Sequence, residues 1–507
     1  MHTMSDPGAS RSTGAKTKKP SLPLESSSRQ LRVLDLFAGC GGLSLGFQRA
    51  GCQIIGAVEL DAKAARSHAL NFPGVHTAND LTDLARDITT LPPADFARLY
   101  LNQGDTARAV DIIVGGPPCQ AFARIGRAKL RALMADPRAH LNDDRASLYT
   151  NFLEYVMYFR PLAVVMENVP DIMNFGGKNV VEEIAASLDD LGYRTSYTIL
   201  NAAWYGVPQL RQRVILLAIR DSLDTTPSFP TPTHFIELPD GYADARRSVL
   251  KVISQQLLLF DKSTRPTHYI EPPPADTALP PAITTAEALG DLPLLYSEEI
   301  RKGAKAFVTP IPYRSDTSLS NYAAQMRDWP GFAAGPTVCD HVTRYLPRDY
   351  QIFREMEPGD EYPQALEIAL SQFHAARSAL LGHPHGNSRI VRDLRRRHVP
   401  PYDAKKFPNK WRKMDRERPA HTLTAHLGKD SYTHIHYDSA QARTITVREA
   451  ARLQSFPDGF RFEGPMNAAF RQIGNAVPPL LAFAVASHLC QLVAASPQRD
   501  LSVSGAA

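Results

Sequence analysis

The sequence predicts an α/β protein, and three observations lead to that prediction. Short, nearly continuous apolar runs of strand length recur along the first 220 residues, helical patterns separate them, and a glycine-rich turn follows the first run. Strands that are apolar on both faces are typical of parallel sheets covered by helices on both sides. We therefore expect a parallel sheet flanked by helices.

The expected elements follow one another in a regular order. The apolar runs are Leu31–Phe37, Ile54–Glu59, Val110–Val114, Ala163–Glu167 and Val214–Ile219. The turn Ala38–Gly42 follows the first run, and the helical pattern of Leu43, Leu45 and Phe47 comes next. This strand, turn and helix order predicts a ligand site at the carboxyl edge of the sheet, where such folds bind their ligands.

The composition and the pattern of the sequence change after Arg220. Proline becomes frequent and the alternation of strands and helices stops until about Thr444, after which the α/β pattern returns with Val447–Leu453 and the apolar helix Leu480–Val493. We therefore predict a catalytic domain at 31–220 and 447–493, interrupted by a long, irregular inserted domain at 221–446. Residues 1–30 are rich in Ser, Lys, Pro and Gly and predict a disordered tail, and 494–507 form a second tail.

Composition excludes several classes of protein. Hydrophobic residues make up 43% of the 507 residues and charged residues 21%, a globular balance that a disordered or fibrous chain does not have. No run approaches 18 apolar residues and the start has no signal-like apolar segment, so we expect no membrane partner. Five cysteines without a CxxC pair argue against disulfides and zinc ribbons and predict a cytoplasmic protein. We also expect no metal at His434 and His436, which lack the spacing of a zinc site.

Positive charge is concentrated in one stretch. The whole chain carries 57 basic and 52 acidic side chains, whereas residues 392–419 alone carry eleven basic and four acidic ones. Aromatic side chains interleave with this charge at Tyr402, Phe407 and Trp411. Such a stretch is typical of a surface that binds a phosphate backbone, and a solvated basic surface is an equal alternative.

The turn after the first strand predicts a nucleoside cofactor. Gly39, Gly41 and Gly42 allow a ligand to approach the backbone closely, and Glu59 ends the next strand, where a carboxylate suits a ribose diol. A nicotinamide cofactor is disfavoured, because Ser44 stands where the third glycine of its fingerprint belongs.

Cys119 is the candidate nucleophile. It follows the strand Val110–Val114 on a loop stiffened by two prolines, with Arg124 and Arg127 close behind it in the sequence. Nearby cations favour the thiolate, which is the reactive form. The alternative is a small, inert, buried cysteine.

Charged residues at the ends of two other strands are further candidates. Glu167 ends a buried run, and a carboxyl group there is costly unless it is paired or catalytic; if protonated, it can donate to a ring nitrogen as a general acid. Arg211 and Arg213 would share one face of an extended strand and could orient an anion or a base carbonyl. Structural ion pairs are the alternative for all three residues.

Eight motifs, taken in order, resemble the DNA cytosine-5 methyltransferases of bacterial restriction-modification systems. The likeness covers about 32–220 and 419–490, and its order along the chain makes it specific. The motifs are Asp35–Gly42, Glu59, Asn79–Asp80, Gly116–Gln120, Glu167–Pro170, Gln209–Arg213, Arg448–Pro457 and Gly474–Pro479.

The resemblance implies a Rossmann-like sheet, S-adenosylmethionine as cofactor and a cytosine flipped out of duplex DNA. By this likeness Cys119 adds to C6 of the base and Glu167 protonates or hydrogen-bonds N3. Arg211 and Arg213 would hold the base carbonyl and the nucleophile loop. C5 then takes the methyl group, and loss of the C5 proton expels Cys119.

The resemblance also implies binding residues. Glu59 would hold the ribose, Leu60 would lie beside the adenine and Asp80 would meet the adenine amino group. The other cofactor residues would be Phe37, Ala38, Gly39, Gly42, Pro117, Leu148, Asn475 and Val477. The insertion would read the DNA as a target-recognition domain, and residues 121–129 would close over it; the expected DNA contacts are Arg124, Arg127, Arg395, Arg396, Arg397, Lys410 and Arg412.

Several alternatives stay open at this stage. The same catalytic fold can methylate a tRNA cytosine, and a catalytically dead homologue could bind DNA without modifying it. A nicotinamide oxidoreductase fits the glycine pattern poorly and leaves the loop of Cys119 unexplained. We expect a monomer in the cytoplasm, and a cognate restriction endonuclease could act beside it as a separate protein.

Overall fold

The computed structural model describes residues 29–75, 84–101, 109–118, 148–175, 179–239, 242, 267–300, 310–381 and 389–496. Met1–Gln30 and Leu31–Ala507 form separate units, and the fold described below is that of the second. Several sequence predictions lie outside the described residues: the tail before residue 29, the end of the chain after residue 496, Asn79, Asp80, Cys119, Arg124 and Arg127.

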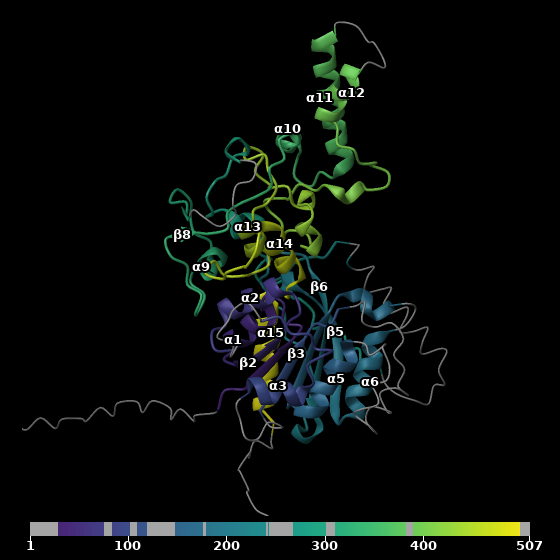
Figure 1. Cartoon of the computed structure of the whole chain (residues 1–507), viewed down its shortest axis with the longest axis vertical. Coiled ribbons are helices and arrows are strands. Elements are labelled where there is room, and N and C mark those ends of the chain that lie inside the picture. Colours follow the sequence, from purple (N-terminus) through teal and green to yellow (C-terminus); the bar gives the residue numbers. More distant parts are fainter. Residues whose placement is uncertain are drawn as a thin grey trace, which may run out of the picture. The chain divides into compact units, whose positions relative to one another are not determined.

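A six-stranded sheet forms the centre of the catalytic domain, with the strand order β2-β1-β3-β4-β6-β5 (Figure 1). The strands are β1 (Arg32–Leu36), β2 (Gln53–Val58), β3 (Ile112–Gly115), β4 (Ala163–Asn168), β5 (Tyr193–Asn201) and β6 (Gln212–Arg220). β1 pairs in parallel with β2 and β3, and β3 pairs in parallel with β4. The α/β prediction is therefore confirmed.

The expectation of an entirely parallel sheet is wrong at one strand. β6 runs antiparallel to both of its neighbours, β4 and β5. Only residues 202–211 separate β5 from β6, and a parallel return needs a crossover of a dozen or more residues. The sequence analysis also missed β5, because its threonine, serine and asparagine residues interrupt the apolar run.

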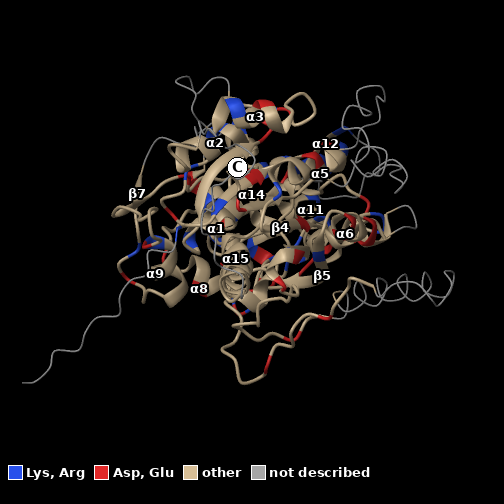
Figure 2. Cartoon of the chain, turned by 90° about the horizontal axis from the view of Figure 1, so that it is seen from below, with Lys and Arg blue, Asp and Glu red and all other residues tan. Residues whose placement is uncertain are grey.

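Helices cover both faces of the sheet. Residues alternate along the strands between two cores, so that Val33 belongs to one core and Leu34 to the other. α1 and α15 pack on each other against the first core, and Figure 2 shows α15 end-on near α1. α3, α5 and α6 supply the second core. The helices around the sheet are α1 (Gly42–Arg49), α2 (Ala62–Asn71), α3 (Pro93–Tyr100), α5 (Leu148–Phe159), α6 (Val180–Asp190), α13 (Val447–Leu453), α14 (Met466–Asn475) and α15 (Pro479–Ala494).

One apolar stretch, Met466–Ala494, has the length and composition of a membrane span. In the fold it is divided at Ala476–Pro478 into α14 and α15, and 56% of its most apolar window is buried inside the protein. α15 has 16 residues and is therefore about 24 Å long, short of the ~30 Å hydrocarbon core of a bilayer. These features are those of a core helix.

The described parts of the inserted segment 221–446 contribute to several separate cores, and its definition as one domain stays a prediction. Side chains around α8 and α9, including Leu289 and Trp329, join the core of the catalytic sheet. A second core gathers around Phe353 and Trp411, and a third lies between α11 and α12. The elements here are α8 (Thr285–Leu289), β7 (Ile311–Pro312), α9 (Asn321–Arg327), β8 (Thr337–Val338), α10 (Tyr350–Glu355), α11 (Tyr362–Leu381) and α12 (Arg389–His398).

Short 3-10 helices connect many of these elements. They are η4 (Pro170–Asn174), η5 (Ala202–Tyr205), η6 (Asp221–Leu223), η7 (Ser297–Glu299), η8 (Pro408–Lys410), η9 (Ala425–Gly428) and η10 (Tyr432–His434).

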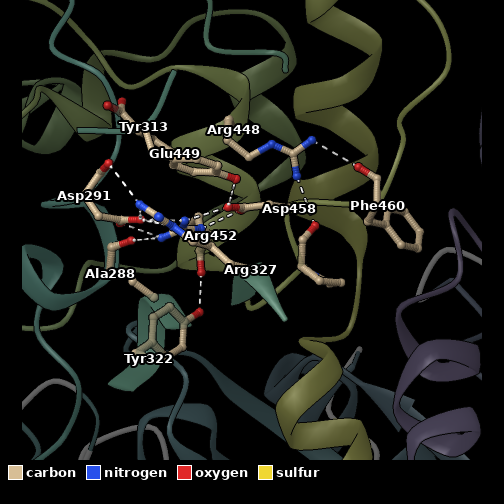
Figure 3. Close-up of polar contacts among 12 residues, drawn as sticks. Ala288, Asp291, Tyr313, Tyr322, Arg327, Arg448, Glu449, Arg452, Asp458 and Phe460 are labelled. Atoms are coloured by element: carbon tan, nitrogen blue, oxygen red, sulfur yellow. Dashed lines mark hydrogen bonds and ion pairs between the residues drawn. The ribbon is translucent and has the colours of Figure 1, made fainter. Parts of the chain in front are cut away.

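A buried ionic network joins the inserted segment to the return segment (Figure 3). Arg452 of α13 is fully buried and forms ion pairs with Asp291, at 2.9 Å, and with Asp458, at 2.5 Å. Its guanidinium also donates to the carbonyl of Ala288, while Tyr322 donates to its backbone carbonyl. Three segments far apart in the sequence are therefore held by one cation, because a buried charge is tolerated only when it is paired and hydrogen-bonded.

Residues 268–270 cover the outer edge of β5. The amide of Tyr197 donates to the carbonyl of His268, and the amide of Ile270 donates to the carbonyl of Tyr197. His268 is also anchored to α6, because its ring nitrogens lie 2.7 Å from both Glu182 and Asp189. Part of the inserted segment thus covers a sheet edge that would otherwise be open to pairing with another chain. The sequence analysis did not predict this contact.

Candidate active site

The turn between β1 and α1 has an unusual backbone. Phe37, Gly39 and Gly41 all adopt positive φ angles, of 60°, 57° and 105°. Gly42 is required for a different reason, since a Cβ atom there would lie 2.2 Å from the carbonyl oxygen of Val477. These glycines let the turn double back tightly and let α1 begin directly against the segment before α15.

A buried polar cluster of Asp35, Ser44 and His68 packs against this turn. Asp35 accepts hydrogen bonds from the backbone amide of Ser44, at 3.2 Å, and from its hydroxyl, at 2.6 Å. The same hydroxyl lies 2.9 Å from Nε2 of His68. Burial raises the pKa of Asp35 to about 7. Gly41 supplies no side-chain cap to α1, so Asp35 performs that role and Ser44 ties it in place.

Glu59 is held at the carboxyl end of β2. Its carboxylate accepts hydrogen bonds from the amide of Gly39, at 2.8 Å, and from the amide of Asp61, at 2.7 Å. Burial raises the pKa of Glu59. Leu60 beside it is 65% exposed, which is unusual for a leucine and leaves its side chain available to a ligand. The carboxylate of Glu59 therefore connects the end of β2 with the turn after β1 and with the start of α2.

A cavity of about 660 Å³ lies at this edge of the sheet. That size lies within the usual range for small-molecule sites. All ten of the described residues that the sequence analysis assigned to the cofactor line it: Phe37, Ala38, Gly39, Gly42, Glu59, Leu60, Pro117, Leu148, Asn475 and Val477. The eleventh, Asp80, lies outside the described residues.

The cavity also has lining residues that the sequence analysis missed. They are Asp61, Arg86, Asp87, Ile88, Asn168, Val169, Arg471 and Gln472, among others. No motif marks residues 86–88, which reach the site because the amide of Arg86 donates to the carbonyl of Glu59. Asn168 and Val169 could have been inferred from their place at the end of an apolar strand, beside Glu167.

Glu167 and Arg213 face each other on the wall of the cavity. Nε of Arg213 lies 2.6 Å from Oε1 of Glu167, and each side chain is about 10% exposed. The reversed direction of β6 makes this pair possible: β6 begins where β4 ends, and Asn168 lies opposite Val214 in the register. In a parallel β6, Arg213 would lie at the far edge of the sheet. The ion pair exists, and its position at the cavity allows it to act on a ligand.

Arg211 lies just before β6 and is completely buried. Its guanidinium donates to the backbone carbonyls of Leu423, Gly474 and Ala476. Burial lowers the pKa of Arg211. Gly474 and Ala476 also line the cavity. In the structure Arg211 therefore positions the segment that closes one side of the cavity.

The nucleophile loop is described as far as Pro118. Nδ2 of Asn168 donates to the carbonyl of Pro117, at 2.7 Å, and a Cβ atom on Gly116 would lie 3.1 Å from Oε2 of Glu167. The chain thus passes directly over the end of β4 immediately before Cys119, which itself lies outside the described residues.

The expected DNA contacts fall into two groups in the structure. Arg395, Arg396 and Arg397 are exposed on α12. Lys410 and Arg412, in contrast, take part in internal ion pairs, with Asp430 and Glu361 respectively. These two side chains have partners within the protein, and their contact with DNA stays a prediction.

The histidines near residue 430 have structural partners. His434 lies within hydrogen-bonding distance of the carbonyl of His421, and His436 accepts from the amide of Asp438 and lies 3.6 Å from Glu449. Burial lowers the pKa values of His434 and His436, to about 4 and about 3.

Comparison with known proteins identifies the family. Residues 31–326 and 341–491 match the family described as C-5 cytosine-specific DNA methylase. The chain belongs to this family. A type II methyltransferase of Oceanobacillus iheyensis is 39% identical to this chain over 467 residues, which cover 90% of this chain and 95% of that protein. The type II methyltransferase M.AgeI of Thalassovita gelatinovora is 28% identical over 481 residues, covering 90% of this chain and 99% of that protein.

A solved structure has the same fold. The crystal structure of a prophage-encoded DNA modification methyltransferase from E. coli superimposes with a TM-score of 0.55 at 22% identity, covering 92% of this chain and all of that one. The predicted family and fold class are confirmed. The chain is a DNA (cytosine-5)-methyltransferase, and S-adenosylmethionine is the methyl donor of its family.

The cavity fits this cofactor. It is large enough for a nucleoside with an amino-acid arm, it places a carboxylate at the end of β2 for a ribose diol, and it exposes Leu60 beside that carboxylate. The tight turn Phe37–Gly41 provides backbone that a ligand can approach closely. The methyltransferase therefore has the parts that its cofactor needs.

Proposed function

We propose that this methyltransferase modifies C5 of a flipped-out cytosine within a specific duplex DNA sequence, by covalent addition of Cys119 to C6. The observation that carries the proposal is the Glu167–Arg213 pair, which lies on the wall of the cavity lined by the cofactor residues. The acid–base pair and the methyl donor would thus share one space at the carboxyl edge of the sheet.

The cofactor supplies a methyl group on a positively charged sulfonium. We assign Glu59 to the ribose hydroxyls and Leu60 to the adenine face, and the backbone of Phe37, Ala38 and Gly39 to the amino-acid arm. Glu59 is already fixed by two backbone amides, so its carboxylate is oriented before the ligand arrives and little ordering is lost on binding.

The base must leave the stack because a thiol cannot attack the face of a stacked ring. Cys119 would then form a bond to C6, while Glu167 donates a hydrogen bond or a proton to N3 and draws electron density from the ring. Arg213 holds the carboxyl group of Glu167 and also lines the cavity, and we assign it to the base carbonyl. C5 takes the methyl group, loses its proton and expels the thiolate.

Arg211 has a positioning role in this proposal. Its bonds to the carbonyls of Gly474 and Ala476 hold the segment that carries Asn475 and Val477 against the cofactor turn. Asn168 does the same for the nucleophile loop through the carbonyl of Pro117. Neither residue needs to touch the substrate to affect the reaction.

We further propose that the protein is the modification enzyme of a restriction-modification system, as the names of its relatives suggest. It would act in the cytoplasm as a monomer, beside a separate cognate endonuclease. The DNA contacts would include Arg395, Arg396 and Arg397 on α12, together with Arg124 and Arg127 in the segment after Cys119.

Transfer of labelled methyl groups to mixed-sequence duplex DNA tests the proposal. We expect label at C5 of cytosine with the intact protein, none with Cys119→Ser, and full activity with Cys339→Ser, which changes an exposed free cysteine as a matched control. A covalent complex with DNA containing 5-fluorocytosine should form only when Cys119 is present. Label on tRNA alone, or label on DNA that survives Cys119→Ser, would overturn the proposal.

A further inference from the structure

Two cysteines from opposite ends of the chain meet beside the catalytic sheet. Sγ of Cys52 lies 3.5 Å from Sγ of Cys490, although 438 positions separate them in the sequence. Cys52 stands immediately before β2, and Cys490 lies in the C-terminal half of α15; both elements lie beside α1 (Figure 1). The spacing of the cysteines in the sequence gave no sign of this contact, because it depends on the packing of the final helix against the first strands.

The fold fixes both sulfur atoms in place. The amide of Cys52 donates to the carbonyl of Phe47, at the end of α1, and Cys52 belongs to the buried core of the sheet. α15 packs along α1, and Leu489, the neighbour of Cys490, is completely buried. Two thiols held in this way have an effective concentration far above that of thiols free in solution.

The two thiols differ in exposure and in acidity. Cys52 is 4% exposed, whereas Cys490 is partly exposed. The hydrogen bond with Cys490, together with burial, raises the pKa of Cys52, and the same hydrogen bond lowers the pKa of Cys490. The more accessible sulfur therefore also ionises more readily, and the thiolate is the reactive form of cysteine.

The other described cysteines lack such a partner. Cys40 is buried, its thiol donates to the carbonyl of Gln472, and burial raises its pKa. Cys339 is exposed, and no other sulfur atom of the described residues lies in contact with it. Cys52 and Cys490 are thus the pair whose positions allow a bond between two thiols.

We propose that Cys52 and Cys490 form a reversible disulfide when the protein meets hydrogen peroxide, and that this bond clamps the first strands of the catalytic domain to its final helix. The sulfur atoms must approach by about 1.5 Å to reach the ~2.05 Å of a disulfide, a movement that rotation about the two Cα–Cβ bonds can supply.

The reaction takes two steps. The thiolate of Cys490 attacks one oxygen of the peroxide, so that an S–O bond forms, the O–O bond breaks, and the departing hydroxide takes up the proton of the thiol as water. Cys52 then attacks the sulfenic sulfur of Cys490. The S–S bond forms as the S–O bond breaks, and the leaving hydroxide takes the proton of Cys52 as a second water. A dithiol reductant returns two electrons and two protons and restores both thiols.

The bond should stabilise the folded chain. It would close a loop of 438 residues and thereby restrict the unfolded chain more than the native one. The clamped helices are those that flank the cofactor cavity, since α1 begins at Gly42 and α15 follows Val477. We expect the midpoint of thermal unfolding to rise by about 5 °C or more on oxidation.

Peptide mapping of the full chain tests the bond. The protein is treated with hydrogen peroxide, the peroxide is removed with catalase, remaining thiols are alkylated, and the chain is digested without reduction. We expect a cross-linked peptide that joins Cys52 to Cys490, its loss on treatment with dithiothreitol, and three of the five cysteines still alkylated. Cys339→Ser is the matched control and should give the same cross-link and the same rise in the unfolding midpoint, whereas Cys490→Ala should give neither.

Trapping with dimedone, a reagent for sulfenic acids, tests the order of the steps. Cys52→Ala should leave Cys490 labelled after peroxide, and Cys490→Ala should leave Cys52 unlabelled. A cross-link to another cysteine, oxidation of Cys490 beyond the sulfenic acid without a cross-link, or an unchanged unfolding midpoint of the cross-linked chain would overturn the inference. The same holds for a label on Cys52 alone. None of these measurements requires methyl transfer, so their outcome is independent of the proposed function.

Discussion

Replacing Gly42 with alanine tests how the two ends of the catalytic domain shape the cofactor cavity. Gly42 begins α1, and Val477 lies between α14 and α15, more than 430 residues later in the chain. The methyl group of Gly42→Ala would lie 2.2 Å from the carbonyl oxygen of Val477. Ordinary contacts begin near 3.4 Å, so one of the two backbones must move by about 1.2 Å.

The expected magnitude follows from this displacement. Overpacking of a closely fitted site usually costs about 1–3 kcal/mol. Both residues line the cofactor cavity, so we expect this cost to appear in cofactor affinity. The dissociation constant for S-adenosylmethionine should rise about 5- to 150-fold, since 1.4 kcal/mol corresponds to a factor of ten.

Isothermal titration with S-adenosylmethionine measures the effect, and thermal unfolding measures stability in parallel. Gly51→Ala is the matched control: Gly51 follows α1, has a φ of 88° and has no atom within 4 Å of an added Cβ. We expect this control to lose about 1 kcal/mol of stability from backbone strain and to bind the cofactor normally. If Gly42→Ala folds and its dissociation constant stays within twofold of the original, the contact with Val477 does not shape the site.

Two further predictions concern charged groups. Arg452→Met should lower the free energy of unfolding at pH 7 by about 3–5 kcal/mol, because Asp291 and Asp458 lose a buried cation. Burial alone would raise the pKa of Asp458, but Arg452 holds that pKa below its ordinary value. The stability that the ion pair contributes is therefore present above pH ~4 and is lost as the pH falls. Urea unfolding should show that the stability deficit of Arg452→Met shrinks in acid, and a deficit that grows in acid would contradict this reasoning. Burial alone would likewise lower the pKa of His268, yet its hydrogen bonds to the carboxylates of α6 raise it to about 9. His268→Gln should therefore cost about 1 kcal/mol below pH 6.5, with the deficit disappearing as the pH rises through 9; a constant deficit in thermal unfolding would show that the charge of His268 is not involved.

Local chemistry made much of the site predictable. The turn after β1 needs glycines because its backbone has positive φ angles, and a carboxylate ends β2 because it must meet both that turn and a ligand. These requirements involve residues close to one strand end. Parallel strands then bring their carboxyl ends to one edge, so motifs spread over the chain converge on one cavity.

Tertiary packing decided the direction of β6, and with it the Glu167–Arg213 pair. The apolar pattern of a buried strand is the same in both directions, so the sequence could not distinguish them. Packing also set the exposure of the basic residues: Lys410 pairs with Asp430, whereas Arg395, Arg396 and Arg397 are exposed on α12. The sequence by itself thus determined which groups the reaction uses and which strand ends carry them. Only the fold decided which charges meet a partner, because an ion pair requires two residues to be close in space, whatever their separation along the chain.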